Sequence, residues 1–187
     1  MELIALLEML RSNYVQQYES TYRSQVELNE EVYPEIAFEI SGGVYKSLFV
    51  ADFIGKNANN NSVIEVGTTD AAYGGDQSFE YNGLSIEFGH VSWDAMRLEL
   101  DPMPQNIAGF ERWFDRWIDL DGAYRKEGAF LSHVIHSASI HDDSVGIDFG
   151  TAPRDAFVQL LDLFKANRVE TIRISSDRKY RLSLIHI

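Results

Sequence analysis

Residues 79–88 read Phe79-Glu80-Tyr81-Asn82-Gly83-Leu84-Ser85-Ile86-Glu87-Phe88, and this stretch has the clearest local pattern in the chain. Apolar and polar side chains alternate on both sides of Asn82-Gly83, as they do in strands with one buried face. Asn-Gly supplies the two positive-φ residues that a type I′ turn requires. The stretch therefore predicts an antiparallel β-hairpin.

Segments on the N-terminal side of this hairpin also have a strand-like period. Residues 36–40 alternate and lead into the turn Ser41-Gly42-Gly43, and residues 45–54 are largely apolar, so the two segments predict another hairpin. We expect the Asn-rich segment 57–62 to be a polar loop, followed by a short strand at 63–66. A flexible loop at 68–77 then leads to the central hairpin.

The C-terminal side predicts more strands of the same kind. Residues 95–100 form an alternating strand that the prolines after Asp101 stop. A third hairpin is expected from residues 130–140 and 145–149, and residues 169–174 predict a last strand. Whether the basic and then apolar tail, residues 177–187, belongs to the fold stays open.

Three segments have helical periodicity instead. Residues 2–20 carry Leu3, Leu7 and Leu10 at helical spacing, and we expect this helix to fray between residues 18 and 23. Residues 105–120 carry an aromatic face, and residues 152–166 form a helix that Thr151 is placed to cap. The sequence thus predicts one α+β domain over residues 1–187, with mainly antiparallel sheet built from hairpins and about three packed helices.

A short internal echo suggests a β-β-α duplication. Ile86-Glu87-Phe88-Gly89 is followed by Asp94, and Ile147-Asp148-Phe149-Gly150 is followed by Asp155 at the same spacing. Strands that end in glycine are common, however, so the echo also fits chance.

Composition indicates a cytoplasmic protein. The chain has no cysteine, which excludes disulfides, zinc-cysteine sites and a thiol nucleophile. Its first residues lack the basic start and long apolar run of a signal peptide, and no stretch is apolar enough for a membrane span. No motif for a phosphate, a dinucleotide or another cofactor is present.

The charge is unevenly distributed. The formal net charge is −13 over 187 residues; residues 1–122 hold 21 acidic and seven basic residues, whereas residues 123–187 hold eight acidic and nine basic ones. Such a negative surface repels nucleic acid and anionic membranes, and it attracts basic proteins. The acidity also fits a simpler role in solubility.

The first functional hypothesis is a protein-binding domain without catalytic activity. Small acidic proteins that neutralise a toxin, the immunity proteins, offer an analogy of class for an inhibitor that holds a basic protein partner. The carboxylates expected to make the contact lie before the first hairpin and in the glycine-rich loop: Glu27, Glu30, Glu31, Glu35, Asp70 and Asp76.

The histidines do not predict a metal site. On one strand His133 and His141 would face one way and His136 the other, and the first two would stand about 26 Å apart at ~3.3 Å per residue. His136 falls in register with Val134 and Ala138, which indicates a hydrogen-bonded histidine at the edge of the core.

The alternative hypothesis is a hydrolase-like enzyme. Glu87 and Asp148 occupy equivalent positions in the echo, and if their strand faces line one cleft they are suited to act as general acid and base. His90 or His141 would assist them. If those faces contact water instead, the two carboxylates are ordinary solvent-side residues.

Overall fold

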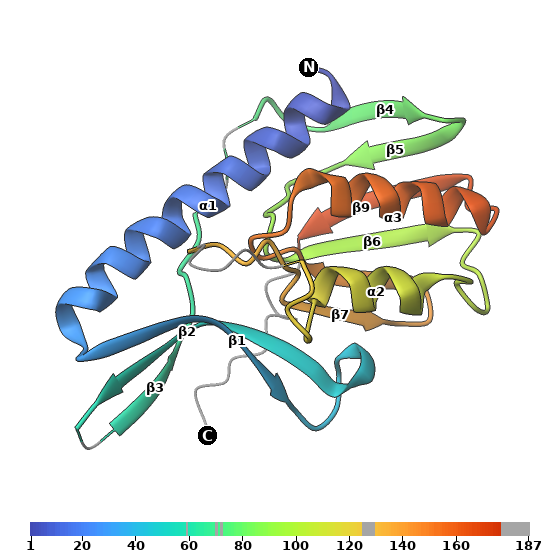
Figure 1. Cartoon of the computed structure of the whole chain (residues 1–187). Coiled ribbons are helices and arrows are strands. Elements are labelled where there is room, and N and C mark those ends of the chain that lie inside the picture. The colour runs from blue at the N-terminus through green and yellow to red at the C-terminus, as the bar shows by residue number, and fades with distance from the viewer. Residues whose placement is uncertain (59, 70, 72, 125–129, 177–187) are drawn as a thin grey trace.

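The computed structural model describes residues 1–58, 60–69, 71, 73–124 and 130–176. Within these ranges the chain forms three α-helices and nine strands, which confirms the α+β class (Figure 1). The helices are α1 (Leu3–Leu28), α2 (Phe110–Ile118) and α3 (Arg154–Ala166). None of them has the length and apolar content that crossing a membrane requires.

The strands form two sheets. An antiparallel three-stranded sheet has the order β1-β2-β3, and a six-stranded sheet has the order β4-β5-β9-β6-β8-β7. Among the described strands, all pairs are antiparallel except β5 with β9. The strands span β1 (Glu31–Glu39), β2 (Leu48–Asn57), β3 (Asn60–Ile64), β4 (Gln77–Tyr81), β5 (Leu84–Phe88), β6 (Met96–Asp101), β7 (Ser137–Ile140), β8 (Ser144–Asp148) and β9 (Thr171–Ser176).

The hairpin predicted at residues 79–88 forms between β4 and β5. Tyr81 pairs with Leu84 across a two-residue turn, and Asn82 and Gly83 have φ values of 49° and 74°. These positive values fit the type I′ turn that Asn-Gly favours. The predicted hairpins β1–β2 and β7–β8 are also present.

The helix boundaries differ from those predicted. Helix α1 does not fray near residue 18, because its buried stripe continues: Tyr18 is fully buried, and the ring of Tyr22 packs on Phe53. Helix α2 begins only at Phe110, after Gly109 with φ 89°. Thr151 does not cap α3; Pro153 occupies that position and the Thr151 hydroxyl contacts Glu35.

Two strand predictions also need correction. Asn60-Asn61-Ser62 of the predicted 57–62 loop belong to a strand, because Asn60–Ile64 pairs with β2 as β3, so the strand predicted at 63–66 begins and ends earlier. Of the predicted 130–140 strand only Ser137–Ile140 is a strand, and His133 before it has φ 60°. Pairing with a neighbouring strand outweighs the low strand propensity of asparagine at β3.

The proposed duplication finds no support in the sheet. Strand β5, which carries Glu87, lies between β4 and the parallel strand β9. Strand β8, which carries Asp148, lies between β7 and the antiparallel strand β6. The two hairpins therefore have neighbours of different direction, as equivalent halves would not.

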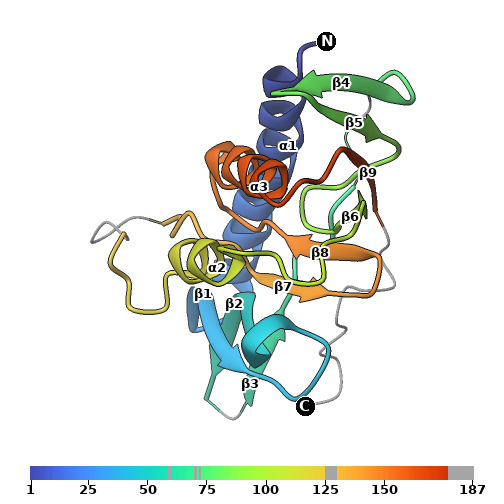
Figure 2. The same ribbon diagram turned by 90° about the vertical axis from the view of Figure 1, so that its right-hand side faces the viewer.

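Three helices cover the sheets and enclose one continuous cluster of buried hydrophobic side chains. Figure 2 shows α2 and α3 on one face of the six-stranded sheet. Helix α1 contacts β1 and β2 of the smaller sheet and also α3, which covers the larger one. On the aromatic face of α2, Trp113 is 5% exposed and donates its indole N–H to the Ala156 carbonyl at 2.9 Å. The side of the six-stranded sheet away from α2 and α3 carries charged residues such as Arg97 and Arg173.

Candidate functional site

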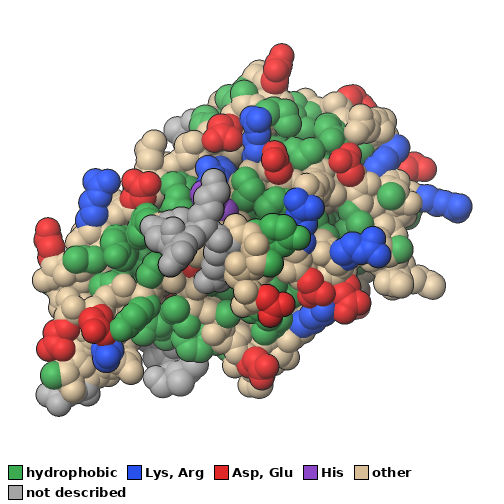
Figure 3. Space-filling view, viewed as in Figure 1, with side chains coloured by type: hydrophobic (Ala, Val, Ile, Leu, Met, Phe, Trp, Pro, Cys, Tyr) green, Lys and Arg blue, Asp and Glu red, His purple; other side chains and the backbone are tan. Residues whose placement is uncertain are grey.

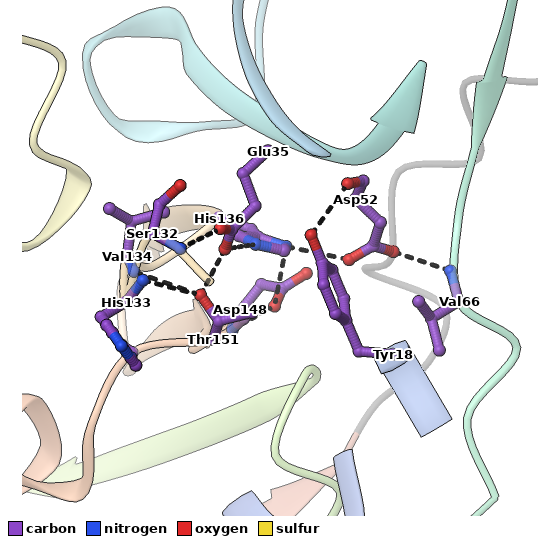
Figure 4. A network of polar contacts seen from close by, with 12 residues as sticks. Tyr18, Glu35, Asp52, Val66, Ser132, His133, Val134, His136, Asp148 and Thr151 are labelled. Carbon is purple, nitrogen blue, oxygen red and sulfur yellow. Dashed lines mark hydrogen bonds and ion pairs between the residues drawn. The ribbon is translucent and has the colours of Figure 1, made fainter. Parts of the chain in front are cut away.

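The most concentrated polar chemistry in the described residues surrounds His136, just before β7 (Figure 4). His136 is 1% exposed. Its Nε2 atom lies 3.2 Å from Oε1 of Glu35 on β1, and its Nδ1 atom lies 3.2 Å from Oδ1 of Asp52 on β2. Asp148 at the end of β8 is 4.0 Å from the same Nδ1 atom. One imidazole thus faces three carboxylates from both sheets.

Other donors complete the contacts of the two buried carboxylates. The hydroxyl of Thr151 donates to Glu35 Oε1, and the backbone N–H of Ser132 donates to Oε2 at 2.6 Å. Both oxygens of Glu35 are therefore hydrogen-bonded, as a buried carboxylate requires.

Asp52 is satisfied from different elements. The Tyr14 hydroxyl on α1 donates to Oδ1 at 2.5 Å, and the backbone N–H of Val66 donates to Oδ2 at 2.7 Å. The Tyr18 hydroxyl donates to the Asp52 carbonyl at 3.3 Å. The helix and both sheets therefore meet at these side chains.

The electrostatics favour the ionised forms of all three groups. Burial by itself would lower the pKa of His136, but hydrogen bonds to Asp52 and Glu35 outweigh it and raise that pKa well above its usual value. Burial would raise the pKa of Asp52 and of Glu35, yet the hydrogen bonds and charge of His136 hold both pKa values below their usual range. These pKa directions favour a charged imidazole between charged carboxylates.

This arrangement acts as a structural junction. A base must offer a free nitrogen to its substrate, whereas both ring nitrogens of His136 contact carboxylates. The backbone of His136 repeats the connection, because its N–H donates to the Asp148 carbonyl at 2.9 Å and its carbonyl accepts from Val50 N–H at 2.8 Å. The residue therefore fastens β2 to β8 through main chain and side chain.

The backbone around the junction has special conformations. Glu35 has φ 50°, and no Cα pair joins it to Asp52 although their neighbours on β1 and β2 pair. Gly150 has φ 45°, and a Cβ atom there would overlap the ring of His136. A side chain at position 150 is thus excluded by the histidine itself.

Sequence reasoning found one member of this cluster. The prediction of a hydrogen-bonded histidine at position 136 is confirmed. The available signal for a partner was Asp52, a lone charge inside the apolar run Phe49–Ile54. No comparable feature of the sequence marked Glu35 as a partner of His136.

The carboxylates predicted to bind a partner fall into separate places. Glu27 in the last turn of α1, Glu30 and Glu31 are all exposed. Glu31 contacts Lys56 at 2.9 Å. Glu35 is 1% exposed and does not belong to this surface.

The two aspartates of the glycine-rich loop do not extend that surface within the described residues. Asp76 is exposed beside β4, which lies near the start of α1, whereas Glu27 and Glu30 lie near its end (Figures 1 and 2). Asp70 lies outside the described residues.

Exposed apolar side chains accompany the glutamates at the end of α1. Leu28 is 71% exposed, Val26 48%, Tyr33 42% and Val63 37%. Tyr33 pairs with Ile54, and Ile54 with Val63, so these three side chains form a row across the three-stranded sheet. The row lies on the face of this sheet opposite to Phe53, which packs on Tyr22 of α1. We give the name α1-end surface to the exposed residues at the end of α1 and on the neighbouring sheet: Val26, Glu27, Leu28, Glu30, Glu31, Tyr33 and Val63. Figure 3 shows hydrophobic and acidic side chains intermingled where α1 ends over this sheet.

The residues of the hydrolase hypothesis are not brought together. Strands β9 and β6 lie between β5 and β8, so three strand spacings of about 4.8 Å separate Glu87 from Asp148. Glu87 contacts Arg173 on the surface at 3.1 Å, and Asp148 lies at the His136 junction.

The two candidate histidines lie elsewhere. His90 is exposed, and His141 contacts the Ser139 hydroxyl at 3.0 Å. His141 lines a surface pocket of about 460 Å³, and neither Glu87 nor Asp148 is among its lining residues. Over the described ranges, no group of three or more His, Asp or Glu side chains is arranged to hold a metal ion.

Comparison with known proteins gives no relative to argue from, because no family model, no curated protein and no solved structure matches this chain.

Proposed function

We propose that this chain is a cytoplasmic, non-catalytic binding domain that holds a basic protein partner, in the manner of an immunity-type inhibitor. The α1-end surface carries the proposal, because it combines carboxylates with solvent-exposed apolar side chains. Stable interfaces combine an apolar centre with a polar rim, and these residues supply exposed side chains of both kinds.

The charges of this surface are available to a partner. Glu27 and Glu30 are exposed and make no ion pair with any described residue, whereas Glu31 forms an ion pair with Lys56. Free carboxylates on a rim attract a basic partner over distances of about a Debye length.

The acid excess of the N-terminal two thirds is largely external. Of the 21 acidic residues in 1–122, four are buried, namely Glu35, Asp52, Asp94 and Asp119, and Asp70 lies outside the described residues. Sixteen remain against seven basic residues. The field that a partner meets is therefore still strongly negative, and it increases the rate of encounter.

Two double variants test this proposal with the same change in net charge. Glu27→Lys with Glu30→Lys reverses the α1-end surface, and Asp76→Lys with Glu80→Lys reverses the exposed carboxylates near β4. The wild type and both variants are used to capture proteins from a lysate of the source organism at low salt, and bound proteins are identified by mass spectrometry. We expect a basic protein that the wild type and the β4 variant retain, that the α1-end variant loses, and that high salt releases.

Kinetics on the captured protein separate this mechanism from general acidity. Reversal at Glu27 and Glu30 should slow association at least tenfold and flatten its salt dependence. Equal loss in both double variants would mean that only net charge matters, and no loss in either would contradict the proposal.

A further inference from the structure

Strand β3 is an open edge beside the α1-end surface. Among the described residues it pairs only with β2, and residues 60–63 are all exposed. Figure 1 shows the β2–β3 hairpin projecting from the body of the molecule at the lower left. The N–H and C=O groups on the outer side of β3 therefore have no strand partner in the described chain, and such an edge is a template for an added strand.

β3 also lacks the features that usually protect an edge. It reads Asn60-Asn61-Ser62-Val63-Ile64, with no proline, no lysine and no other charge. Charged or proline residues at an edge oppose pairing with other chains.

The other three edge strands differ from β3. β1 carries Pro34 between Glu31 and Glu35 and is packed against α1, and β4 carries Glu80. β7 is in contact with β2 of the other sheet. β3 is therefore the least protected of the four edges that the described residues form.

The side chains of the three-stranded sheet indicate which kind of residue a strand added to β3 would carry. The row Tyr33–Ile54–Val63 crosses all three strands and ends at the exposed Val63. A fourth strand would place an apolar residue beside Val63 and continue this row. Its alternate residues would then project to the opposite face.

The net charge of the chain indicates which kind of molecule would pair with the β3 edge. A second copy of this chain would bring two molecules of net charge −13 together at this edge. Like charges oppose that pairing, whereas Lys and Arg in an added segment are attracted. We infer that the partner inserts an extended basic segment, with an apolar residue opposite Val63, as a fourth strand on β3. This inference rests on the proposed function and adds the mode of binding.

The test uses the whole chain and a synthetic peptide of alternating Lys and Val. Two further peptides carry backbone N-methyl groups, one on every Lys and the other on every Val. In an added strand the N–H groups of alternate residues face the neighbouring strand, so one methylated set blocks pairing and the other does not. We expect one methylated peptide to bind more than about tenfold more weakly than the parent and the other to bind like it.

Hydrogen exchange locates the peptide. The parent should slow amide exchange in the segment 60–64, and the weak methylated peptide should not. No binding of the parent at low salt, equal binding of all three peptides, or protection elsewhere would overturn strand addition. If the three peptides bind equally and the Glu27→Lys, Glu30→Lys variant abolishes that binding, the acidic surface stands and only the strand mechanism fails.

Discussion

The Nδ1 atom of His136 lies 3.2 Å from Oδ1 of Asp52, so a histidine preceding β7 of the larger sheet is paired with a carboxylate in the middle strand of the smaller one. Glu35 contacts the other ring nitrogen. The position of the three-stranded sheet, and of the α1-end surface on it, therefore depends on a charged contact inside the molecule.

The stability of the wild type should depend on pH at both ends of the range. The pKa values of Glu35 and Asp52 are lowered by folding, so their contribution is present above about pH 4 and is lost as pH falls through the folded-state values. The pKa of His136 is raised, so its contribution is complete below about pH 6.5 and is lost as pH rises through the folded-state value. Urea unfolding across this range should give a maximum between about pH 4.5 and pH 6.5.

Replacing the histidine should reverse the way in which the unfolding free energy changes with pH at the acidic end of the range. His136→Gln leaves Glu35 and Asp52 buried without a cation, and removal of one partner from a buried ion pair costs about 3–5 kcal/mol of unfolding free energy. That cost should shrink as pH falls toward 4, because the carboxyl groups can then bind protons. The exposed His133 supplies the control, His133→Gln, which should change stability little at any pH. Destabilisation by His136→Gln that does not vary with pH would show that the junction is not ionised.

Two glycines of the internal echo should respond differently to alanine. At Gly150 a Cβ atom would overlap the His136 ring and φ is 45°, so Gly150→Ala should lower the unfolding free energy by several kcal/mol, of the order found for core overpacking plus strain. At Gly89 the added Cβ would lie 3.6 Å from the Ile174 carbonyl oxygen, an ordinary contact. Gly89→Ala should therefore change stability by less than about 1 kcal/mol. Thermal unfolding of both variants measures the difference, and similar melting temperatures would contradict the close contact at Gly150.

The apolar side chains of the α1-end surface should slow the dissociation of the bound partner. Leu28 is 71% exposed, so Leu28→Ser should leave the melting temperature unchanged but increase the rate at which the partner dissociates, by about tenfold if the side chain is a buried anchor in the complex. Leu120→Ser changes a side chain that is 49% exposed outside this surface and is the matched control. Surface plasmon resonance with the captured partner would decide, and equal dissociation rates for the two variants would remove Leu28 from the interface.

Local patterns were sufficient for the elements that local chemistry controls. The Asn82-Gly83 turn and the helical spacing of Leu3, Leu7 and Leu10 required no knowledge of the rest of the chain. The strand expected at 63–66 begins earlier, at Asn60, and its first part was missed because Asn60 and Asn61 favour turns in isolation. Only pairing with β2 makes these two residues part of a strand.

The junction could be predicted only in part for a related reason. His136 was identifiable from its apolar neighbours in the sequence, but Glu35 contacts it from a position 101 residues away. Carboxylates are usually exposed, so a glutamate in an acidic segment was assigned to the surface. Nothing in the sequence near Glu35 indicates its positive φ or the hydroxyl of Thr151 beside it.

The place of β9 in the sheet has a consequence for the order of folding. β9 is the last described strand, yet it lies between β5 and β6 and is the only described strand that joins the β4–β5 hairpin to the rest of the six-stranded sheet. During synthesis from the N-terminus, the two parts of that sheet have no shared backbone hydrogen bonds until residues 171–176 leave the ribosome. Contacts between positions so distant in sequence form slowly, and the apolar faces of both parts are exposed to other chains during that interval.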